Sequence, residues 1–434
     1  MNNAALKGSV YNVMIEKKDG VAVYNTRTGN LIRAFDDRAS TILEALQDTK
    51  DIEKMDSNIL NVLVDKGILV SDEIDEFAEM ERMEIEAKYD GYLHLIILPT
   101  EECNFRCIYC YEQFWRGDMS KEVQEGLVNF VEKQIDGYDG LIVSWFGGEP
   151  LEAFDIIVYL SQKFIEICKR HKKVYNAGMS TNGYNLSVEN LNILKKLHIT
   201  EYQITIDGPA FIHDTQRVLR DGSGTFDVII NNLIQIKREV HSSALQFVLR
   251  TNWSRQLVTK FDEFYNFLIQ NFEDDKRFIF FWQMIEDYGF IRNDEVKNIF
   301  CDESEHNMIL KYGFHHLKKN YSHLMYKPVG SVCYAFKKNA YVVSSDGMIK
   351  KCTCDMEKKR NRFGNICNDI DVLKENEWLE MRKINRNSKC AQCIKRPICH
   401  NRSCYKMVGC PPHLRYLNEV LEKLSEDREE YIEI

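Results

Sequence analysis

The stretch "LHLIILP" (residues 93–99), followed after three residues by "CNFRCIYCYE" (103–112), determines how the rest of the chain is interpreted. Its first part is a mostly apolar run of strand length. Its second part places Cys103, Cys107 and Cys110 in the spacing Cys-x3-Cys-x2-Cys. A closed zinc site needs a fourth ligand that no nearby His or Cys offers, and a redox Cys-x2-Cys pair would leave Cys103 unexplained. An iron–sulfur cluster held by thiolates fits the residue type and leaves one iron open to a small molecule.

Strand-like and helix-like stretches alternate downstream of this point. The further strand-like runs are "LIVSWF" (141–146), "VYNAGMS" (174–180), "EYQITID" (201–207), "LQFVLR" (245–250) and "RFIFFWQ" (277–283). Helical patterns lie between them at 120–135, 152–171, 187–197, 225–239 and 257–272. This alternation predicts parallel βαβ units. Six repeats are too few to close an eight-stranded barrel, so we expect an α/β fold with a partial, open (β/α)6 TIM-like barrel.

The loops that carry unusual residues all follow predicted strands. The cysteines follow the first strand, "GGEP" (147–150) the second, "TNG" (181–183) the third and "DGP" (207–209) the fourth. In barrels of this kind the chemistry lies at the carboxyl ends of the strands. The sequence therefore predicts the site at that end.

The regions on either side of the barrel have different patterns. Residues 1–80 contain "YNVMIE", "VAVYN", "NLIRAF" and "GILVSD" as short strands with helical patterns near 38–48 and 55–66, which predicts a winged-helix-like module. An acidic helical linker (81–91) leads to the barrel (92–324). Residues 325–415 are rich in cysteine with little periodicity, as expected where metal holds a fold. A charged helix (416–434) follows.

Composition narrows the class of protein. The chain has 434 residues, a formal net charge of -9, and 44% hydrophobic residues. The negative charge argues against a nucleic-acid partner. No apolar run reaches the ~18 residues of a membrane span, and the N-terminus lacks a secretory signal, so we expect a cytoplasmic protein. In a reducing compartment, clustered cysteines among the 14 are metal ligands or catalysts, whereas isolated Cys168 and Cys301 are expected to be inert.

The pattern Cys-x3-Cys-x-aromatic-Cys, with Tyr109 as the aromatic residue, resembles that of the radical S-adenosylmethionine (SAM) enzymes. The resemblance implies that Cys103, Cys107 and Cys110 hold a [4Fe-4S] cluster whose open iron binds the methionine end of SAM. It further implies reductive cleavage of SAM to a 5′-deoxyadenosyl radical that abstracts hydrogen from a substrate. An external electron donor such as a ferredoxin or flavodoxin is then expected.

Other loops resemble SAM contacts of the same family. "FGGEP" (146–150) resembles the loop whose backbone and acid meet the amino group of SAM, which implicates Gly147, Gly148 and Glu149. "ITIDGPAFIHDTQR" (204–217) resembles a run of the peptide-modifying branch, which places Thr205 and Arg217 near the carboxylate of SAM. Arg suits that position because its planar fork pairs with a carboxylate.

The C-terminal cysteines resemble the SPASM extension, which carries two auxiliary [4Fe-4S] clusters. The resemblance assigns Cys333, Cys352 and Cys404 to the first, and Cys390, Cys393, Cys399 and Cys410 to the second, making three clusters in all. The first set has three matched ligands, so either Cys354 is the fourth or the site is open to a substrate thiolate. Cys367 matches no ligand. Cys-x2-Cys spacing also fits two zinc knuckles.

Two branches of the family compete for the function. Anaerobic sulfatase-maturing enzymes place an Asp directly after the cysteine corresponding to Cys352, where this chain has Thr353, and generally lack the small N-terminal module. Maturases of ribosomally made peptides often carry one, which resembles a domain that binds a leader peptide at an exposed sheet edge, here expected in "VAVYN" or "NLIRAF". We therefore expect a maturase that forms a thioether or carbon–carbon crosslink. The alternative from another class is a non-catalytic iron–sulfur or zinc scaffold.

Overall fold

The chain folds into two compact units in the computed structural model. Unit 1 comprises Met1–Tyr89, Tyr312–Cys333 and Glu380–Ile434, and unit 2 comprises Asp90–Lys311 and Tyr334–Leu379. The predicted region 325–415 is thus divided between the units, and the predicted domain boundaries stay predictions. The described residues are 5–47, 52, 55–285, 294–302, 304–305, 308, 333–368, 370–381, 388–399, 414, 417–426, 428 and 431–434.

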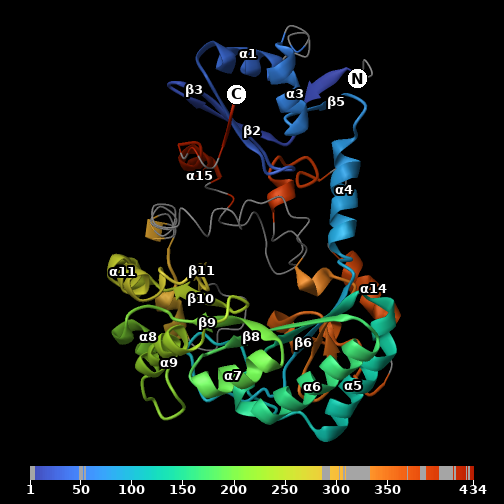
Figure 1. Cartoon of the computed structure of the whole chain (residues 1–434), viewed down its shortest axis with the longest axis vertical. Coiled ribbons are helices and arrows are strands. Elements are labelled where there is room, and N and C mark those ends of the chain that lie inside the picture. The colour runs from blue at the N-terminus through green and yellow to red at the C-terminus, as the bar shows by residue number, and fades with distance from the viewer. Residues whose placement is uncertain are drawn as a thin grey trace. The chain divides into compact units, whose positions relative to one another are not determined.

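Unit 2 is built on a curved sheet in the order β11-β10-β9-β8-β7-β6-β12-β13 (Figure 1). The six predicted strands are confirmed as β6 (Tyr92–Ile97), β7 (Gly140–Trp145), β8 (Val174–Thr181), β9 (Ile199–Thr205), β10 (Gln246–Trp253) and β11 (Phe278–Met284), each parallel to its neighbours. The α/β fold with a partial barrel is therefore confirmed. Sequence reasoning missed β12 (Ala340–Val343), which pairs parallel with β6, and β13 (Ile349–Lys350), which pairs antiparallel with β12.

Helices between the strands cover the outside of this sheet (Figure 1). The helix α5 shows why they form: Ser120 caps its N-terminus by accepting from Val123 N, and Leu127 and Val131 on one face are buried. The helices of unit 2 are α5 (Lys121–Gln134), α6 (Phe154–Arg170), α7 (Val188–Lys196), α8 (Ala210–Gln216), α9 (Phe226–Glu239), α10 (Arg255–Val258), α11 (Phe261–Phe272) and α14 (Val372–Glu380, whose last residue belongs to unit 1). The short 3-10 helices are η1 (Ile135–Gly137), η2 (Pro150–Ala153), η3 (Asp294–Ile299), η4 (Tyr334–Phe336), η5 (Thr353–Asp355), η6 (Lys359–Asn361) and, in unit 1, η7 (Arg396–Ile398).

Unit 1 contains a second sheet, in the order β14-β4-β3-β2. Its strands are β2 (Asn12–Lys17), β3 (Gly20–Asn25), β4 (Leu31–Phe35) and β14 (Ile432–Glu433), and a separate pair joins β1 (Leu6–Gly8) to β5 (Leu69–Ser71). Its helices are α1 (Asp36–Gln47), α3 (Ser57–Asp65), α4 (Glu76–Ala87) and α15 (Leu417–Leu424). Asp56 and Asp75 cap α3 and α4 by accepting backbone N–H groups of the first turn. The expected winged-helix-like class of this module stays a prediction.

Two expectations for unit 1 were wrong. A helix was predicted over 416–434, but α15 ends at Leu424. Further along the chain, Ile432 and Glu433 form the strand β14, which pairs with β4. The stretches "VAVYN" and "NLIRAF" are not the sheet edge, because β3 pairs with β2 and β4, and β4 pairs with β3 and β14. Tertiary pairing with residues far along the chain decided both points.

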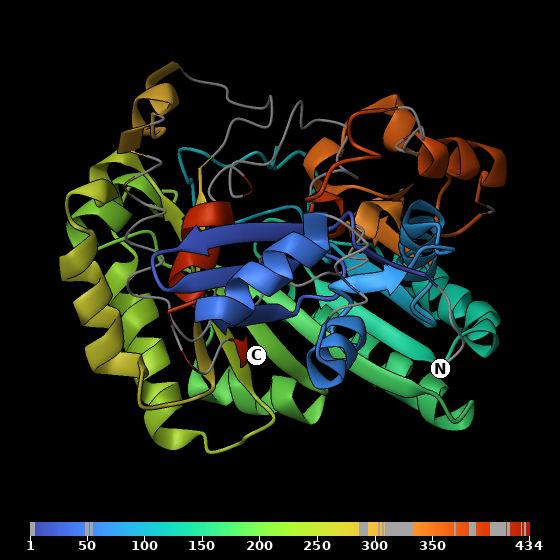
Figure 2. The same cartoon turned by 90° about the horizontal axis from the view of Figure 1, so that it is seen from above.

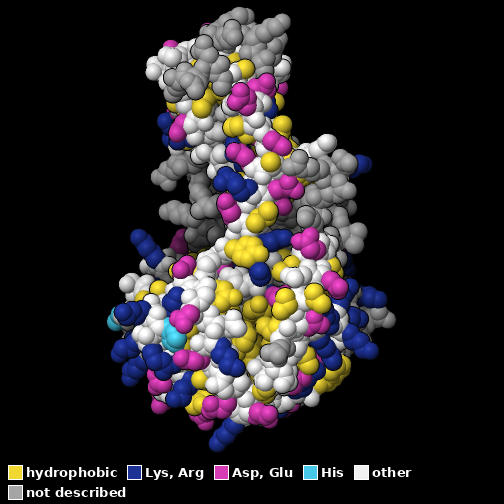
Figure 3. Space-filling model, turned by 90° about the vertical axis from the view of Figure 1, so that its right-hand side faces the viewer, with side chains coloured by type: hydrophobic (Ala, Val, Ile, Leu, Met, Phe, Trp, Pro, Cys, Tyr) yellow, Lys and Arg dark blue, Asp and Glu magenta, His cyan; other side chains and the backbone are white. Residues whose placement is uncertain are grey.

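The surface and the helix lengths bear on possible partners. On the face drawn in Figure 3, Lys and Arg side chains are interspersed with Asp and Glu side chains. Among the described residues, no helix combines the length and apolar character that crossing a membrane requires.

Candidate active site at the cysteine loop

The cysteine loop follows β6 and is held by backbone hydrogen bonds to the segment after α8. Arg106 N donates to Val218 O at 2.8 Å, Ile108 N to Gln216 O at 3.0 Å, and Arg220 N to Asn104 O at 3.0 Å. Phe105 and Leu219 form an antiparallel bridge between the same two segments. The segment 216–220, at and after the end of α8, therefore positions the cysteine loop directly, which the sequence pattern did not reveal.

The three thiols lie close enough to influence one another. Phe105 N donates to Cys103 Sγ at 3.3 Å, and Cys110 N donates to Cys107 O at 3.1 Å, which folds the loop into a turn. Burial and then the charge of Glu149 raise the pKa of Cys103 to about 12. Burial and then Cys107 raise the pKa of Cys110. Thiols this close repel one another as thiolates, and cationic iron would stabilise the thiolates, so this donor set fits a [4Fe-4S] cluster.

The glycines of "FGGEP" allow the second loop to pack against the first. A Cβ at Gly147, whose φ is 120°, would lie 2.3 Å from Thr100 O, and one at Gly148 would lie 2.2 Å from Glu102 O. Glu149 N donates to Glu102 O at 2.8 Å. The sequence interpretation had these glycines approach a ligand, whereas the contacts that require them are with the backbone just before Cys103.

Glu149 is fully buried and joins the second loop to the third. Its carboxylate accepts from Thr181 Oγ1 at 2.7 Å, Asn182 N at 2.7 Å and Leu151 N at 3.0 Å. Burial raises its pKa to about 7, and the hydrogen bond from Asn182 N counteracts the rise. The "TNG" stretch is thus a turn that holds this carboxylate.

A buried polar network surrounds the hydroxyl of Tyr109. This hydroxyl donates to Asp207 Oδ2 and accepts from Arg217 at 2.9 Å and from Asn252 Nδ2 at 3.2 Å. Asn252 N also donates to Asp207 Oδ1 at 2.9 Å. Sequence reasoning singled out Tyr109 and Arg217 but missed Asp207 and Asn252. Asp207 ends the predicted strand 201–207, and Asn252 comes shortly after the predicted strand 245–250. Their position at the carboxyl ends of strands was the signal that could have identified them.

Arg217 is buried beside the first cluster site. Its guanidinium lies 5.7 Å from the ring centre of Phe105, and its charge counteracts the rise that burial causes in the pKa of Cys107. Among the described residues, its buried Nε has no hydrogen-bond partner. Thr205 ends β9 and is half-buried, in register with Arg250. The expected contacts of Thr205 and Arg217 with SAM stay predictions.

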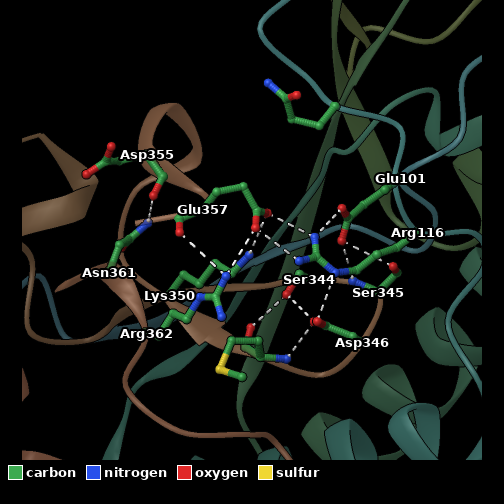
Figure 4. Close-up of polar contacts among 12 residues, drawn as sticks. Glu101, Arg116, Ser344, Ser345, Asp346, Lys350, Asp355, Glu357, Asn361 and Arg362 are labelled. Carbon is green, nitrogen blue, oxygen red and sulfur yellow. Dashed lines mark hydrogen bonds and ion pairs between the residues drawn. The ribbon is translucent and has the colours of Figure 1, made fainter. Parts of the chain in front are cut away.

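An ion network joins the cysteine loop to the segment that follows β12 (Figure 4). Arg116 donates to Glu101 at 2.8 Å and to Glu357 at 3.0 Å, and its Nε lies 2.9 Å from Asp346. Glu101 and Arg116 flank the cysteines, whereas Asp346 and Glu357 flank Cys352. The network therefore fixes the two cysteine-bearing segments of unit 2 to each other.

The C-terminal cysteines divide between the units. Cys352 is held by Asn361, which accepts from Cys352 N at 3.1 Å and donates to Cys352 O at 2.8 Å. Cys354 lies near Tyr111, whose pKa rises through burial and then through the charge of Cys354. Cys333 belongs to unit 1, so its grouping with Cys352 stays a prediction. Cys404 lies outside the described residues, as does Cys410.

Three cysteines of the predicted second auxiliary set follow one another on tight turns. Cys393 N donates to Cys390 O at 3.4 Å, Arg396 N to Cys393 O at 2.9 Å, and Cys399 N to Arg396 O at 3.2 Å. Thiols are the donors that hold iron–sulfur clusters, so the three cysteines fit such a cluster by donor type, and their grouping around one cluster stays a prediction. Among the described residues, no group of three His, Cys, Asp or Glu side chains has the arrangement for a single metal ion.

Parts of the chain are similar to known protein sequences. Residues 97–255 match the model of the Radical SAM superfamily. The Fe-coproporphyrin III synthase of Methanosarcina barkeri is 23% identical over 167 residues, which are 38% of this chain and 38% of that protein. The chain spans 34%, 38% and 59% of the length of three curated relatives it matches.

Two solved structures share the fold at low sequence identity. Native anSMEcpe with bound AdoMet and Kp18Cys peptide is 19% identical, with a TM-score of 0.58 over 77% of this chain and 97% of that chain. Streptococcus suis SuiB bound to precursor peptide SuiA is 16% identical, with a TM-score of 0.51 over 98% of each chain.

A partial barrel with three cysteines after its first strand and "GGEP" after its second defines a class of cofactor-dependent enzyme. That class is the radical SAM enzymes, and residues 97–255 form a radical SAM domain. In fold the chain resembles anSMEcpe and SuiB.

Proposed function

We propose that the protein is a radical SAM peptide maturase that forms a thioether or carbon–carbon crosslink in a ribosomally made precursor peptide. The observation that carries this proposal is the extent of the fold. SuiB bound to its precursor peptide matches 98% of this chain, which includes the N-terminal module, whereas anSMEcpe matches 77%. With SAM and a reduced cluster bound, cleavage of SAM supplies the radical that abstracts hydrogen from the peptide.

The residues of the chain then have separate tasks in this proposal. Cys103, Cys107 and Cys110 hold the first of three [4Fe-4S] clusters, and the Tyr109 network orients Arg217 toward the carboxylate of SAM. Arg217 Nε, buried without a partner among the described residues, supports this assignment because a buried donor requires an acceptor. The buried "GGEP" and "TNG" loops keep the cysteine loop fixed around the cluster.

The residue after Cys352 argues against the sulfatase-maturing alternative, which shares the fold. Thr353 is buried, and its hydroxyl is hydrogen-bonded to the Tyr334 hydroxyl at 2.6 Å. A threonine hydroxyl is a poor base compared with the Asp carboxylate that sulfatase-maturing enzymes place after the corresponding cysteine. The sulfatase-maturing alternative therefore suits these residues less well than the crosslinking reaction proposed here.

The N-terminal sheet supplies the proposed binding site for the leader peptide. Among the described residues β2 pairs with β3 alone, so its outer edge is open to an added strand, and at six residues it is longer than β14, the two-residue strand at the opposite edge. Met14 on β2 is 43% exposed, whereas Val13 is buried. A leader strand would gain backbone hydrogen bonds from β2 and side-chain contacts from its exposed face.

The test uses short peptides encoded beside this gene. Each is incubated without oxygen with the reconstituted protein, SAM and dithionite, and the products are analysed by mass spectrometry. We expect 5′-deoxyadenosine together with a peptide that has lost two hydrogen atoms and contains a new internal bond. Conversion of a Cys or Ser of a sulfatase peptide to an aldehyde, with no crosslink in any encoded peptide, would favour the alternative.

Colour separates an enzyme of this class from a zinc scaffold. Protein purified without air should be brown and should bleach with dithionite, because thiolate-bound iron absorbs visible light. A colourless protein that binds zinc would contradict the proposal.

A further inference from the structure

The two faces of the N-terminal sheet bury different parts of the chain. Side chains alternate across a strand, so Val21 and Val23 of β3 point to one face and Ala22 and Tyr24 to the other. The first face packs on α1 and α3, the module's own helices. The second face packs on residues from the far end of the chain, which are Ile398, Leu414, Leu417, Val420 and Leu421. Figures 1 and 2 show α1 and α15 on opposite faces of this sheet.

The second face contacts the predicted cluster loop itself. Cys399 and Ile394 are half-buried against the same apolar group as Val13 and Leu31 of the sheet. Thr26, at the end of β3, donates its hydroxyl to Ile394 O at 2.5 Å. The sheet thus makes both apolar and polar contacts with the stretch of the loop that runs from Cys393 to Cys399, two of the proposed ligands.

A buried arginine ties the loop to α4. Arg396 is 1% exposed, and its Nε donates to Glu84 at 2.9 Å. Its guanidinium lies 4.3 Å from the ring centre of Phe77. The carboxylate and the aromatic face hold this buried guanidinium in one position, because moving away from them would leave a buried charge without compensation.

The segment after the loop is anchored to the sheet as well. Arg33 donates to Ser425 O at 2.8 Å, and Lys17 donates to Glu422 O at 2.8 Å. Ile432 and Glu433 pair with Ile32 and Arg33. The loop is therefore bounded on its C-terminal side by an element that packs on the same sheet face.

We propose that the N-terminal module has a second function: its sheet and α4 hold the cluster loop Cys390–Cys399 and so determine how firmly the second auxiliary cluster is retained. The inference rests on the proposed ligands Cys390, Cys393 and Cys399, and it does not depend on which bond the enzyme forms. A fixed loop holds its thiols at cluster spacing, whereas a loosened loop exposes them to exchange.

The test compares two pairs of substitutions in the full chain. Thr26→Val with Glu84→Gln removes the hydroxyl and the charge that contact the loop. Thr28→Val with Glu79→Gln is the matched control, because Thr28 donates to Lys66 O at 2.8 Å and Glu79 pairs with Arg27 at 2.6 Å, both inside the module. Each protein is reconstituted without air, and the release of iron to a chelator is followed.

We expect the Thr26/Glu84 variant to release about four iron atoms per chain at least tenfold faster than the unchanged protein, with the remainder released at the normal rate. The control should release iron as the unchanged protein does, and SAM cleavage without peptide should be the same in all three. Unchanged release in the test variant, or equal acceleration in both variants, would overturn the inference. Equal iron content in Cys393→Ser and the unchanged protein would overturn the ligand assignment instead.

A second measurement uses the unchanged protein alone. If the loop and sheet support each other, cluster loading should slow hydrogen exchange of the β3 amides (20–25), since anything bound only by the folded form stabilises it. Exchange is compared before and after removal of iron by the chelator. Equal exchange rates in β3 would contradict the coupling even where the variants cannot be purified.

Discussion

At the scale of single residues, the Tyr109 hydroxyl is where the cysteine loop meets two other loops. Asp207 follows β9, Asn252 lies near the end of β10, and Arg217 follows α8, yet all three contact this one oxygen. A hydroxyl that donates once and accepts twice has its hydrogen-bonding capacity filled, so its position is fixed. The aromatic residue beside Cys110 is therefore a structural centre as well as part of a motif.

Cys107→Ala should abolish SAM cleavage while the protein stays folded. The cysteine lies on a loop, whereas the barrel core consists of buried residues on the strands and helices. The measurement is 5′-deoxyadenosine formation with dithionite, with far-ultraviolet circular dichroism to check folding. Cys168→Ala, on α6, is the control and should retain cleavage. Undiminished product from Cys107→Ala would refute the cluster assignment.

The barrel should lose stability in acid partly through His94. Burial and then the nearby Lys337 lower the pKa of His94 to about 4 from 6.5. Between these values the unfolded chain binds a proton that the folded chain does not, so the free energy of unfolding falls by at most about 1.4 kcal/mol per unit as pH drops. The substitution His94→Gln keeps a hydrogen-bond partner for Ser144. In this variant the free energy of unfolding, measured with urea, should fall less between about pH 7 and pH 5 than in the unchanged protein. Identical slopes in both proteins would count against this.

At the scale of elements, the loop contacts make the second loop a support for the first. Gly148→Ala would place a Cβ 2.2 Å from Glu102 O, a backbone atom that can move only with the cysteine loop. We expect iron content to fall by about four atoms per chain and SAM cleavage to be lost. Gly117→Ala, on the cysteine loop and with no atom within 4 Å of its Cβ, is the control and should behave normally. Full iron content in Gly148→Ala would show that the loop tolerates the shift.

The same elements show what the sequence could predict. The six barrel strands are long apolar runs with helices between them, so local pattern sufficed. The strand β12 has four residues within a cysteine-rich stretch, and its pairing of Ala340 with His94 depends on residues far apart, which periodicity cannot reveal. The cysteines and "GGEP" could be found from their spacing. Asp207 and Asn252 could not, because their function arises only where separate loops converge.

At the scale of the whole molecule, the division into units changes what a truncation would do. Removing residues 1–80 leaves the cysteine loop in unit 2, so SAM cleavage without peptide should persist. It also strips the apolar partners of Leu417, Val420 and Leu421, so binding of a hydrophobic dye should rise. Peptide modification should fall steeply, because the leader supplies the effective concentration of the substrate. A truncated protein that crosslinks peptide at the full rate would contradict the recognition function of the module.

The pairing of β14 with β4 has a consequence during synthesis on the ribosome. Residues 32 and 432 pair, so the sheet of unit 1 can be completed only after about 400 further residues have been synthesised. At about 5–20 residues per second, that interval is roughly 20 to 80 s. Throughout it, the face bearing Tyr24 and Leu31 is exposed to the cell while later parts of the chain are being made. We expect the first segment to be translated to be among the last to reach its final form, and to depend on chaperones until release.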